Sequence, residues 1–175
     1  MKKKTYSFSI GLKALLITGM LLFTFAFISC ENQRETVQRI PVLNFEEFEP
    51  YLKKNNDTTY VINFWATWCK PCIEEMPAFL KLDSLYSGQK FKLVLVSLDF
   101  PDKLESQVIP YIRENDIESE VVLLHATDAN SWINKVDSNW SGAIPVTLVY
   151  NKNSREFYER IFTFEELQEI VQSKI

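Results

Sequence analysis

A pair of cysteines directly after an apolar run constrains the fold of this chain more than any other feature. The run is YVINFWA, residues 60–66, and the pair is Cys69 and Cys72 in the segment TWCKPC. β-Branched and aromatic residues dominate the run, which is typical of a buried strand. Pro71 suits the first turn of a helix, where its missing N–H group is not needed. The pattern therefore predicts a strand that leads into a helix with Cys69 at its start.

Two cysteines at this spacing can bind a metal, form a structural disulfide or form a redox pair. Structural zinc needs four ligands, and apart from Cys30 the chain offers these two thiols and His125. A disulfide that closes so short a loop removes little chain entropy. A helix N-terminus stabilises a thiolate, and Lys70 adds a positive charge. We therefore interpret the pair as redox-active: Cys69 attacks a substrate disulfide and Cys72 resolves the mixed disulfide.

The first 29 residues have the pattern of a targeting segment. Three lysines near the start precede an uncharged apolar run, residues 14–28, which ends in FISC. This ending resembles the bacterial lipoprotein box, in which the cysteine, here Cys30, carries lipid. Lipidation also leaves one pair among the three cysteines. An uncleaved signal anchor is the alternative. Both interpretations place the domain in the cell envelope, facing the periplasm and tethered to a membrane.

Charge argues against a nucleic-acid partner. The chain has 19 basic and 23 acidic residues, and four of the lysines but none of the acids lie in the targeting segment. The rest of the chain therefore carries 15 basic against 23 acidic residues. Phosphate backbones are bound by basic stripes, and this balance is the opposite.

The remaining sequence alternates between strand and helix patterns. A polar tether over residues 30–39 leads into a domain that we predict over residues 40–175. Helix patterns occur at 44–56, with Asn44 as the predicted cap, at 70–87, at 104–115 and at 163–175, with Thr163 as the predicted cap. Strand patterns occur at 60–66, 91–99 and 120–125, and a hairpin pattern occurs at 144–162. This order predicts an α/β fold with a mixed central β-sheet flanked by helices.

The segment NFWATWCKPC, with CIEEMP after it, resembles the thioredoxin superfamily and in particular the envelope thiol–disulfide oxidoreductases of the TlpA/ResA type. The resemblance covers about residues 40–175. Pro77 stands five residues after Cys72, where thioredoxins kink the active-site helix. The resemblance implies a thioredoxin-like fold with an inserted helix and strand around residues 100–140.

The resemblance also implies a substrate-binding surface beside the cysteines. The strand sequence GAIPVTLVY matches the family's proline strand, so Pro145 is expected to be cis and to face the disulfide. The backbone of Ile144 would pair with an extended substrate peptide, and Trp68 would frame the surface. For Trp132 and Trp140, a substrate groove and simple core packing are both open.

Glu75 is the candidate for proton transfer. Thioredoxins carry a buried aspartate six residues before the first cysteine, and Asn63, which cannot take a proton, stands at that position. In the TlpA/ResA group a glutamate three residues after the second cysteine lies near the pair, and Glu75 matches it. We hypothesise that Glu75 tunes the thiol pKa values or relays protons to Cys72. An ordinary exposed helix glutamate is the alternative.

These features together predict a membrane-tethered, monomeric protein-disulfide reductase of the cell envelope. Its redox group would be the disulfide itself, with no metal and no separate cofactor. Its substrates would be disulfide-containing envelope proteins, and a membrane electron donor would recharge it, because the compartment is oxidising. A disulfide oxidant or isomerase and a non-enzymatic binding module are alternatives. A peroxidase of the related peroxiredoxin group needs a PxxxTxxC setting, which Thr67 and Trp68 do not supply.

Overall fold

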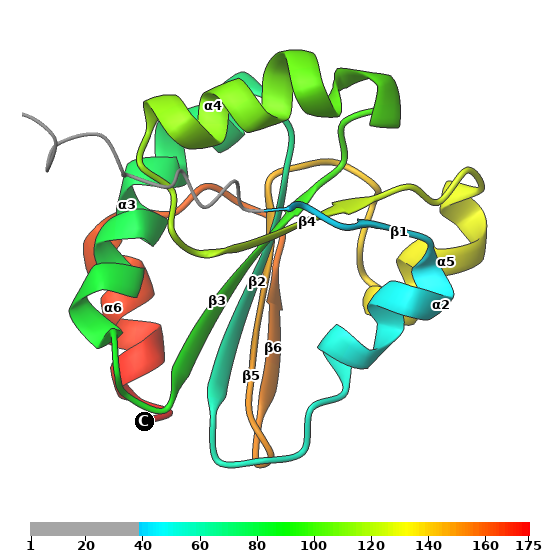
Figure 1. Ribbon diagram of the computed structural model, residues 1–175. Coiled ribbons are helices and arrows are strands. Elements are labelled where there is room, and N and C mark those ends of the chain that lie inside the picture. Colours follow the sequence, from blue (N-terminus) through cyan, green and yellow to red (C-terminus); the bar gives the residue numbers. More distant parts are fainter. Residues whose placement is uncertain (1–38) are drawn as a thin grey trace, which may run out of the picture. The chain divides into compact units, whose positions relative to one another are not determined.

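A six-stranded mixed β-sheet forms the centre of the structure, a computed structural model that describes residues 39–175 (Figure 1). The strands are β1 (Val42–Leu43), β2 (Thr59–Trp65), β3 (Phe91–Ser97), β4 (Glu120–Leu124), β5 (Val146–Tyr150) and β6 (Arg155–Tyr158). Their order is β1-β4-β3-β2-β5-β6. The first four strands pair in parallel, and β5 pairs antiparallel with both β2 and β6. The predicted targeting segment, with Cys30 and nearly all of the tether, lies outside the described residues.

Helices cover both faces of this sheet. They are α2 (Phe45–Phe48), α3 (Lys70–Tyr86), α4 (Ile109–Glu114), α5 (Ala129–Val136) and α6 (Phe164–Gln172), with 3₁₀ turns η2 (Glu49–Leu52) and η3 (Pro101–Lys103) and a π-helical turn η4 (Leu104–Val108). One core cluster lies between the sheet and α3, α4 and α6, and a second lies between the sheet and α2 and α5 (Figure 1). The predicted mixed sheet flanked by helices is thereby confirmed.

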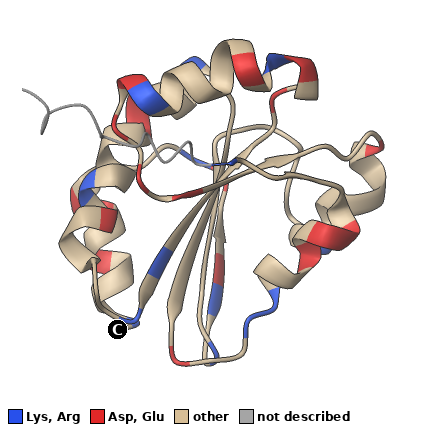
Figure 2. Ribbon diagram, viewed as in Figure 1, with Lys and Arg blue, Asp and Glu red and all other residues tan. Residues whose placement is uncertain are grey.

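Charged residues of both signs are distributed over the ribbon rather than gathered in one region. Figure 2 shows Lys and Arg interspersed with Asp and Glu on the helices and near the strand ends, whereas the middle of the sheet is largely uncharged. Within residues 39–175, no helix is both long and apolar enough to cross a membrane.

Prolines account for the local departures from the predicted helices. The helix that begins at the predicted cap, Asn44, becomes the 3₁₀ turn η2 at Pro50, because proline cannot donate the α-helical hydrogen bond. Residues 104–115 divide into the π-helical turn η4 and the helix α4, with Pro110 in the first turn of α4. In contrast, α3 continues through Pro77. The expected inserted helix and strand are α4 and β4, and α5 is an additional helix that we did not predict.

Tryptophans fill the core on both sides of the sheet. Trp132 and Trp140 are buried and pack edge to face with ring centroids 5.4 Å apart. The indole of Trp140 also donates to the carbonyl of Ala143 at 2.7 Å. The interpretation of these residues as walls of an open substrate groove is therefore wrong, because both are core residues. Trp65 is likewise fully buried and packs against Tyr111.

The cap of α6 gives a stability prediction. Thr163 accepts from the backbone N–H of Glu166, whose side chain accepts in return from the N–H of Thr163. Thr163→Ala should lower the free energy of unfolding by about 1 kcal/mol, because a helix donor loses its partner. Urea unfolding measures the change. Ser173→Ala, at the other end of α6, is the control, and an equal loss in both variants would contradict the capping role.

Candidate active site

The disulfide lies after β2, at the start of α3. Cys69 is the N-cap residue of α3 and is bonded to Cys72 with an S–S distance of 2.00 Å. The backbone N–H of Cys72 also points at the Cys69 sulfur, at 3.3 Å. Cys69 retains 5% of its surface and Cys72 retains none. Of the two cysteines, Cys69 is therefore the one with surface that a substrate can approach, and its sulfur lies where helix N–H groups stabilise a thiolate.

The segment before β5 forms the wall next to this sulfur. The carbonyl oxygen of Ile144 lies 3.8 Å from Cys69 Sγ, and the Ile144–Pro145 peptide bond is cis. Pro145 is buried and Ile144 is half-buried, whereas Trp68 is 63% exposed. The structure thus brings Ile144 beside Cys69. The contact of Trp68 with a substrate remains a prediction.

Glu159 binds the loop that leads to Ile144 through hydrogen bonds to Ser141. Its carboxylate accepts from the backbone N–H of Ser141 at 3.0 Å and also from the Ser141 hydroxyl. These bonds hold the pKa of Glu159 below its usual range. The loop that leads to Ile144 is therefore anchored to Glu159.

The carboxylate of Glu75 is buried beneath the active-site helix. Only 2% of this residue is exposed, which excludes the alternative of a solvated glutamate on the helix surface. Oε1 accepts from Asn63 Nδ2 at 3.0 Å, and Oε2 accepts from the backbone N–H of Phe162 at 2.9 Å. Burial raises the pKa of Glu75 to about 7, although these two hydrogen bonds and the charge of Arg160 act against the rise. A group with this pKa exchanges its proton near neutrality.

Asp99 is a site residue that we did not predict. It follows β3, is 2% exposed, and accepts from both the N–H (3.0 Å) and the hydroxyl (2.6 Å) of Thr67. It also accepts from the hydroxyl of Ser97 at 2.9 Å. These bonds fix the loop that carries Trp68 and Cys69. The sequence signal that could have identified Asp99 is an acidic residue at the end of a strand that is otherwise apolar.

The remaining predicted residues lie on α3. Lys70 is largely exposed and forms an ion pair with Glu74 at 3.6 Å. An exposed pair of this kind is screened by water, so the charge of Lys70 acts only weakly on Cys69. Pro71 occupies the first turn of α3, and Pro77 lies on its exposed side.

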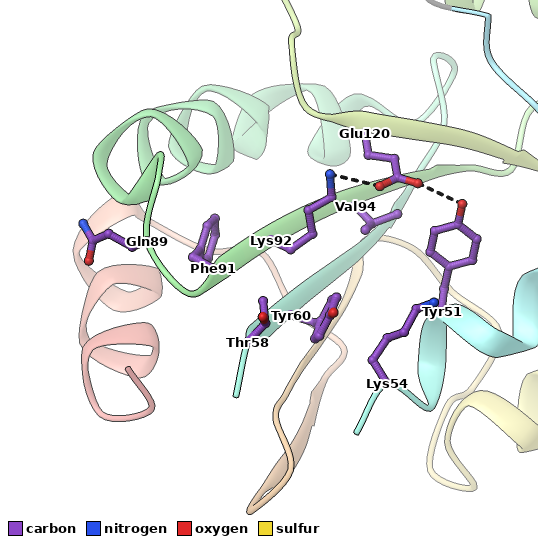
Figure 3. Close-up of a pocket in the computed structure, with 9 residues that line it drawn as sticks. All are labelled: Tyr51, Lys54, Thr58, Tyr60, Gln89, Phe91, Lys92, Val94 and Glu120. Atoms are coloured by element: carbon purple, nitrogen blue, oxygen red, sulfur yellow. Dashed lines mark hydrogen bonds and ion pairs between the residues drawn. The ribbon is translucent and has the colours of Figure 1, made fainter. Parts of the chain in front are cut away.

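A separate cavity of about 410 Å³ opens at the N-terminal ends of β2, β3 and β4, whereas the disulfide follows the C-terminal end of β2 (Figure 3). Glu120 lies at its rim, where it accepts from the hydroxyl of Tyr51 at 2.8 Å and pairs with Lys92 at 3.0 Å. The carboxylate of Glu120 thus binds both the hydroxyl of Tyr51 and the ammonium group of Lys92. No residue of the predicted site lines this cavity.

Comparison with known proteins identifies the family. The family model described as AhpC/TSA family matches residues 41–155. Thioredoxin-like protein YneN of Bacillus subtilis is 40% identical over 63 residues, which make up 36% of this chain and 36% of YneN, about a third of its length. Thiol-disulfide oxidoreductase ResA of Bacillus cereus is 30% identical over 129 residues, which make up 70% of this chain and 72% of ResA.

Solved structures give the same result for the fold. A thioredoxin-related protein from Neisseria meningitidis serogroup B matches with a TM-score of 0.58 and 22% identity, over 70% of this chain and 87% of that chain. The expected thioredoxin-like fold and the resemblance to ResA-type proteins are thereby confirmed. Since the family model spans well over half of the sequence, this chain belongs to the thioredoxin-like AhpC/TSA family.

Proposed function

We propose that the protein is a thiol–disulfide oxidoreductase that reduces disulfides of envelope proteins. The observation that carries this proposal is the disulfide at the N-terminus of α3, with Cys69 accessible and Cys72 enclosed. In the dithiol form, the Cys69 thiolate attacks a substrate disulfide, and one substrate sulfur leaves as a thiolate. Cys72 then attacks Cys69 Sγ, which releases the second substrate thiolate and leaves the Cys69–Cys72 disulfide. Two electrons pass to the substrate in each cycle.

Glu75 is the proposed acceptor for the proton of Cys72. Cys72 must lose this proton before it attacks, and it lies in a buried place where solvent does not reach it. Glu75 lies one helical turn further along α3, on the buried side, and its pKa of about 7 suits a group that takes and releases a proton near neutrality. Asn63, at the place of the thioredoxin aspartate, supports Glu75 through a hydrogen bond instead.

The reducing direction is supported by the small contribution of charged side chains to the stability of the thiolate, which the helix N–H groups provide. A strong oxidant requires a strongly stabilised reduced form. Here Lys70 is exposed and paired with Glu74. Ionised Glu75, on the same helix, would repel a thiolate and so disfavour the reduced form.

A direct test is the reduction potential of the Cys69–Cys72 couple, measured by equilibration with a series of glutathione or dithiothreitol buffers. We expect a value near that of thioredoxin, about −270 mV. A value near about −120 mV would instead support the disulfide oxidant.

The partners follow from the same proposal. Substrates would be disulfide-containing envelope proteins that lay an extended segment against the backbone of Ile144 and the exposed Trp68. A membrane electron donor would restore the dithiol, because the compartment is oxidising. We propose that the protein acts as a monomer and that the disulfide is its only redox group. The ResA relative of Bacillus cereus carries the name of a thiol–disulfide oxidoreductase, which supports the reaction class.

We further propose a lipid anchor at Cys30, which lies outside the described residues. Cells grown with a clickable fatty-acid analogue should label the wild-type protein, and Cys30→Ala should lose the label, because the thioether to lipid requires this sulfur. Cys69→Ala, expressed in parallel, is the control that removes a different thiol. An unlabelled wild-type protein that retains residues 1–29 would favour the uncleaved signal anchor.

A further inference from the structure

A buried hydrogen-bond chain links Glu75 to β5. Asn63 on β2 and Thr147 on β5 lie opposite each other in antiparallel register, and both are fully buried. Asn63 Nδ2 donates to Glu75 Oε1 at 3.0 Å and to Thr147 Oγ1 at 3.1 Å. Both hydrogens of the amide are therefore engaged, one toward the acid and one toward the neighbouring strand.

The oxygen of the same amide lacks a hydrogen-bond partner in the part of the chain that the structure describes. Asn63 Oδ1 is buried and accepts no hydrogen bond from residues 39–175. A buried polar atom without a partner is unusual and normally destabilises the fold. It also leaves the amide unrestrained on that side. A half-turn about the Asn63 χ2 bond would exchange Nδ2 and Oδ1. It would break the two hydrogen bonds that Nδ2 makes and would carry the two N–H groups to the side where Oδ1 now has no partner, so the new bonds to Oδ1 must offset this cost.

Such a half-turn matches the chemistry of the acid. Ionised Glu75 can only accept hydrogen bonds, so it requires Nδ2 of Asn63. Protonated Glu75 carries an O–H donor, so it requires Oδ1. Because the backbone N–H of Phe162 occupies Oε2, the proton belongs on Oε1, the oxygen that faces Asn63. The hydroxyl of Thr147 can accept from Nδ2 or donate to Oδ1, and it therefore fits both orientations.

We propose that Asn63 and Thr147 form a reversible switch that follows the proton on Glu75. The amide donates to the carboxylate and turns to accept from the carboxylic acid, while the Thr147 hydroxyl changes from acceptor to donor. No proton travels along the pair, since only the orientation of its hydrogens changes. Asn63 and Thr147 are thus positioning residues that set the proton affinity of Glu75. Their part in turnover rests on the proposed function, whereas the switch itself does not.

The other groups around Glu75 cannot exchange donor for acceptor. The N–H of Phe162 is a backbone donor ahead of α6. Arg160 contributes its charge but is bound to Glu166 at 2.7 Å. Cys72, on the same helix, is held in the disulfide. In the oxidised protein, the Asn63 amide is thus the partner of Glu75 that can exchange donor for acceptor.

The oxidised wild-type protein tests the switch without any variant. The ¹³Cδ resonance of Glu75 reports its protonation, and the ¹⁵Nδ2 resonance of Asn63 should change with the same midpoint as pH is varied. Nuclear Overhauser contacts from the Asn63 amide hydrogens to Thr147 should be present on the alkaline side and absent on the acid side. The amide of Asn151, which donates to the carbonyl of Lys174 at 3.1 Å, is the internal control and should not titrate. Contacts that persist on both sides would overturn the proposal.

Variants provide a second measurement. Asn63→Leu should raise the proton affinity of Glu75 about tenfold or more, because the ionised form loses the stronger hydrogen bond. Thr147→Val should raise it by a smaller factor, because one Asn63 N–H is left without an acceptor, and Thr147→Ser should restore it. Thr59→Val, which removes another buried hydroxyl from β2, is the control. Equal Glu75 midpoints in wild type and Thr147→Val would overturn the role of Thr147.

These readouts separate the switch from the proposed function. None of them requires exchange with a substrate disulfide. A protein that shows the switch but reduces no disulfide would contradict only the proposed function. A protein that reduces disulfides while its Asn63 amide stays fixed would contradict only the switch.

Discussion

Replacing Cys72 by serine should turn the protein into a covalent trap for its substrates. Cys69 could still attack a substrate disulfide, but no second thiol would release the product, so mixed disulfides should accumulate. Turnover should fall by about 10³-fold or more, as for the loss of other groups that form the covalent chemistry of a site. Non-reducing gels of envelope proteins, followed by mass spectrometry of the bands, measure the trapping.

Cys69→Ser is the matched control and should trap nothing. Cys69 is 5% exposed, whereas Cys72 is fully buried. A large substrate therefore has access to one sulfur only. Trapping by Cys69→Ser and not by Cys72→Ser would reverse the two roles.

The second large effect is a pH dependence of stability that originates in Glu75. In the folded protein the pKa of Glu75 is raised to about 7 from 4.5, so the folded state binds more protons than the unfolded state between these values. The free energy of unfolding should therefore fall as pH rises through this window, by about 3 kcal/mol at most, and stay level above it. Glu75→Gln, which resembles the protonated acid, should lack this loss.

The measurement is the difference between the unfolding curves of wild type and Glu75→Gln from pH 4 to 8, in the disulfide form. Other carboxyl groups, such as Glu156, have lowered pKa values and give the opposite slope, but they act equally in both proteins. Glu74→Gln, on the exposed side of α3, is the control and should follow wild type closely. Parallel curves for wild type and Glu75→Gln would show that burial does not shift this acid.

The fold was predictable wherever a pattern was local. The apolar strand before Cys69, the proline in the first turn of α3 and the cap at Thr163 each appear at their predicted places. The helix α5 was missed because it has only eight residues, and Trp132 and Val136 are the two that are buried. Its stability comes from packing against residues distant in sequence, which no local pattern reports.

The site was predictable only in part for a similar reason. The cysteine pair and the location of Glu75 on α3 follow from spacing along one helix. The partners of Glu75 come from β2 and from the segment before α6, and the anchor of the Cys69 loop is Asp99 after β3. Each of these contacts joins residues that are far apart in the chain. Sequence spacing gives the residue types but not which of them meet.

The bond between Glu75 and the N–H of Phe162 has a consequence for the order in which the enzyme matures. Chains are made from the N-terminus, and domains complete their folding as later segments become available. Cys69 and Cys72 are only three residues apart, so their pairing does not require any later segment of the chain. The enclosure of Glu75 needs Phe162, close to the C-terminus. A chain synthesised only as far as α3 therefore already contains both cysteines and Glu75, and the buried surroundings of Glu75 are completed only when the segment with Phe162 has been added.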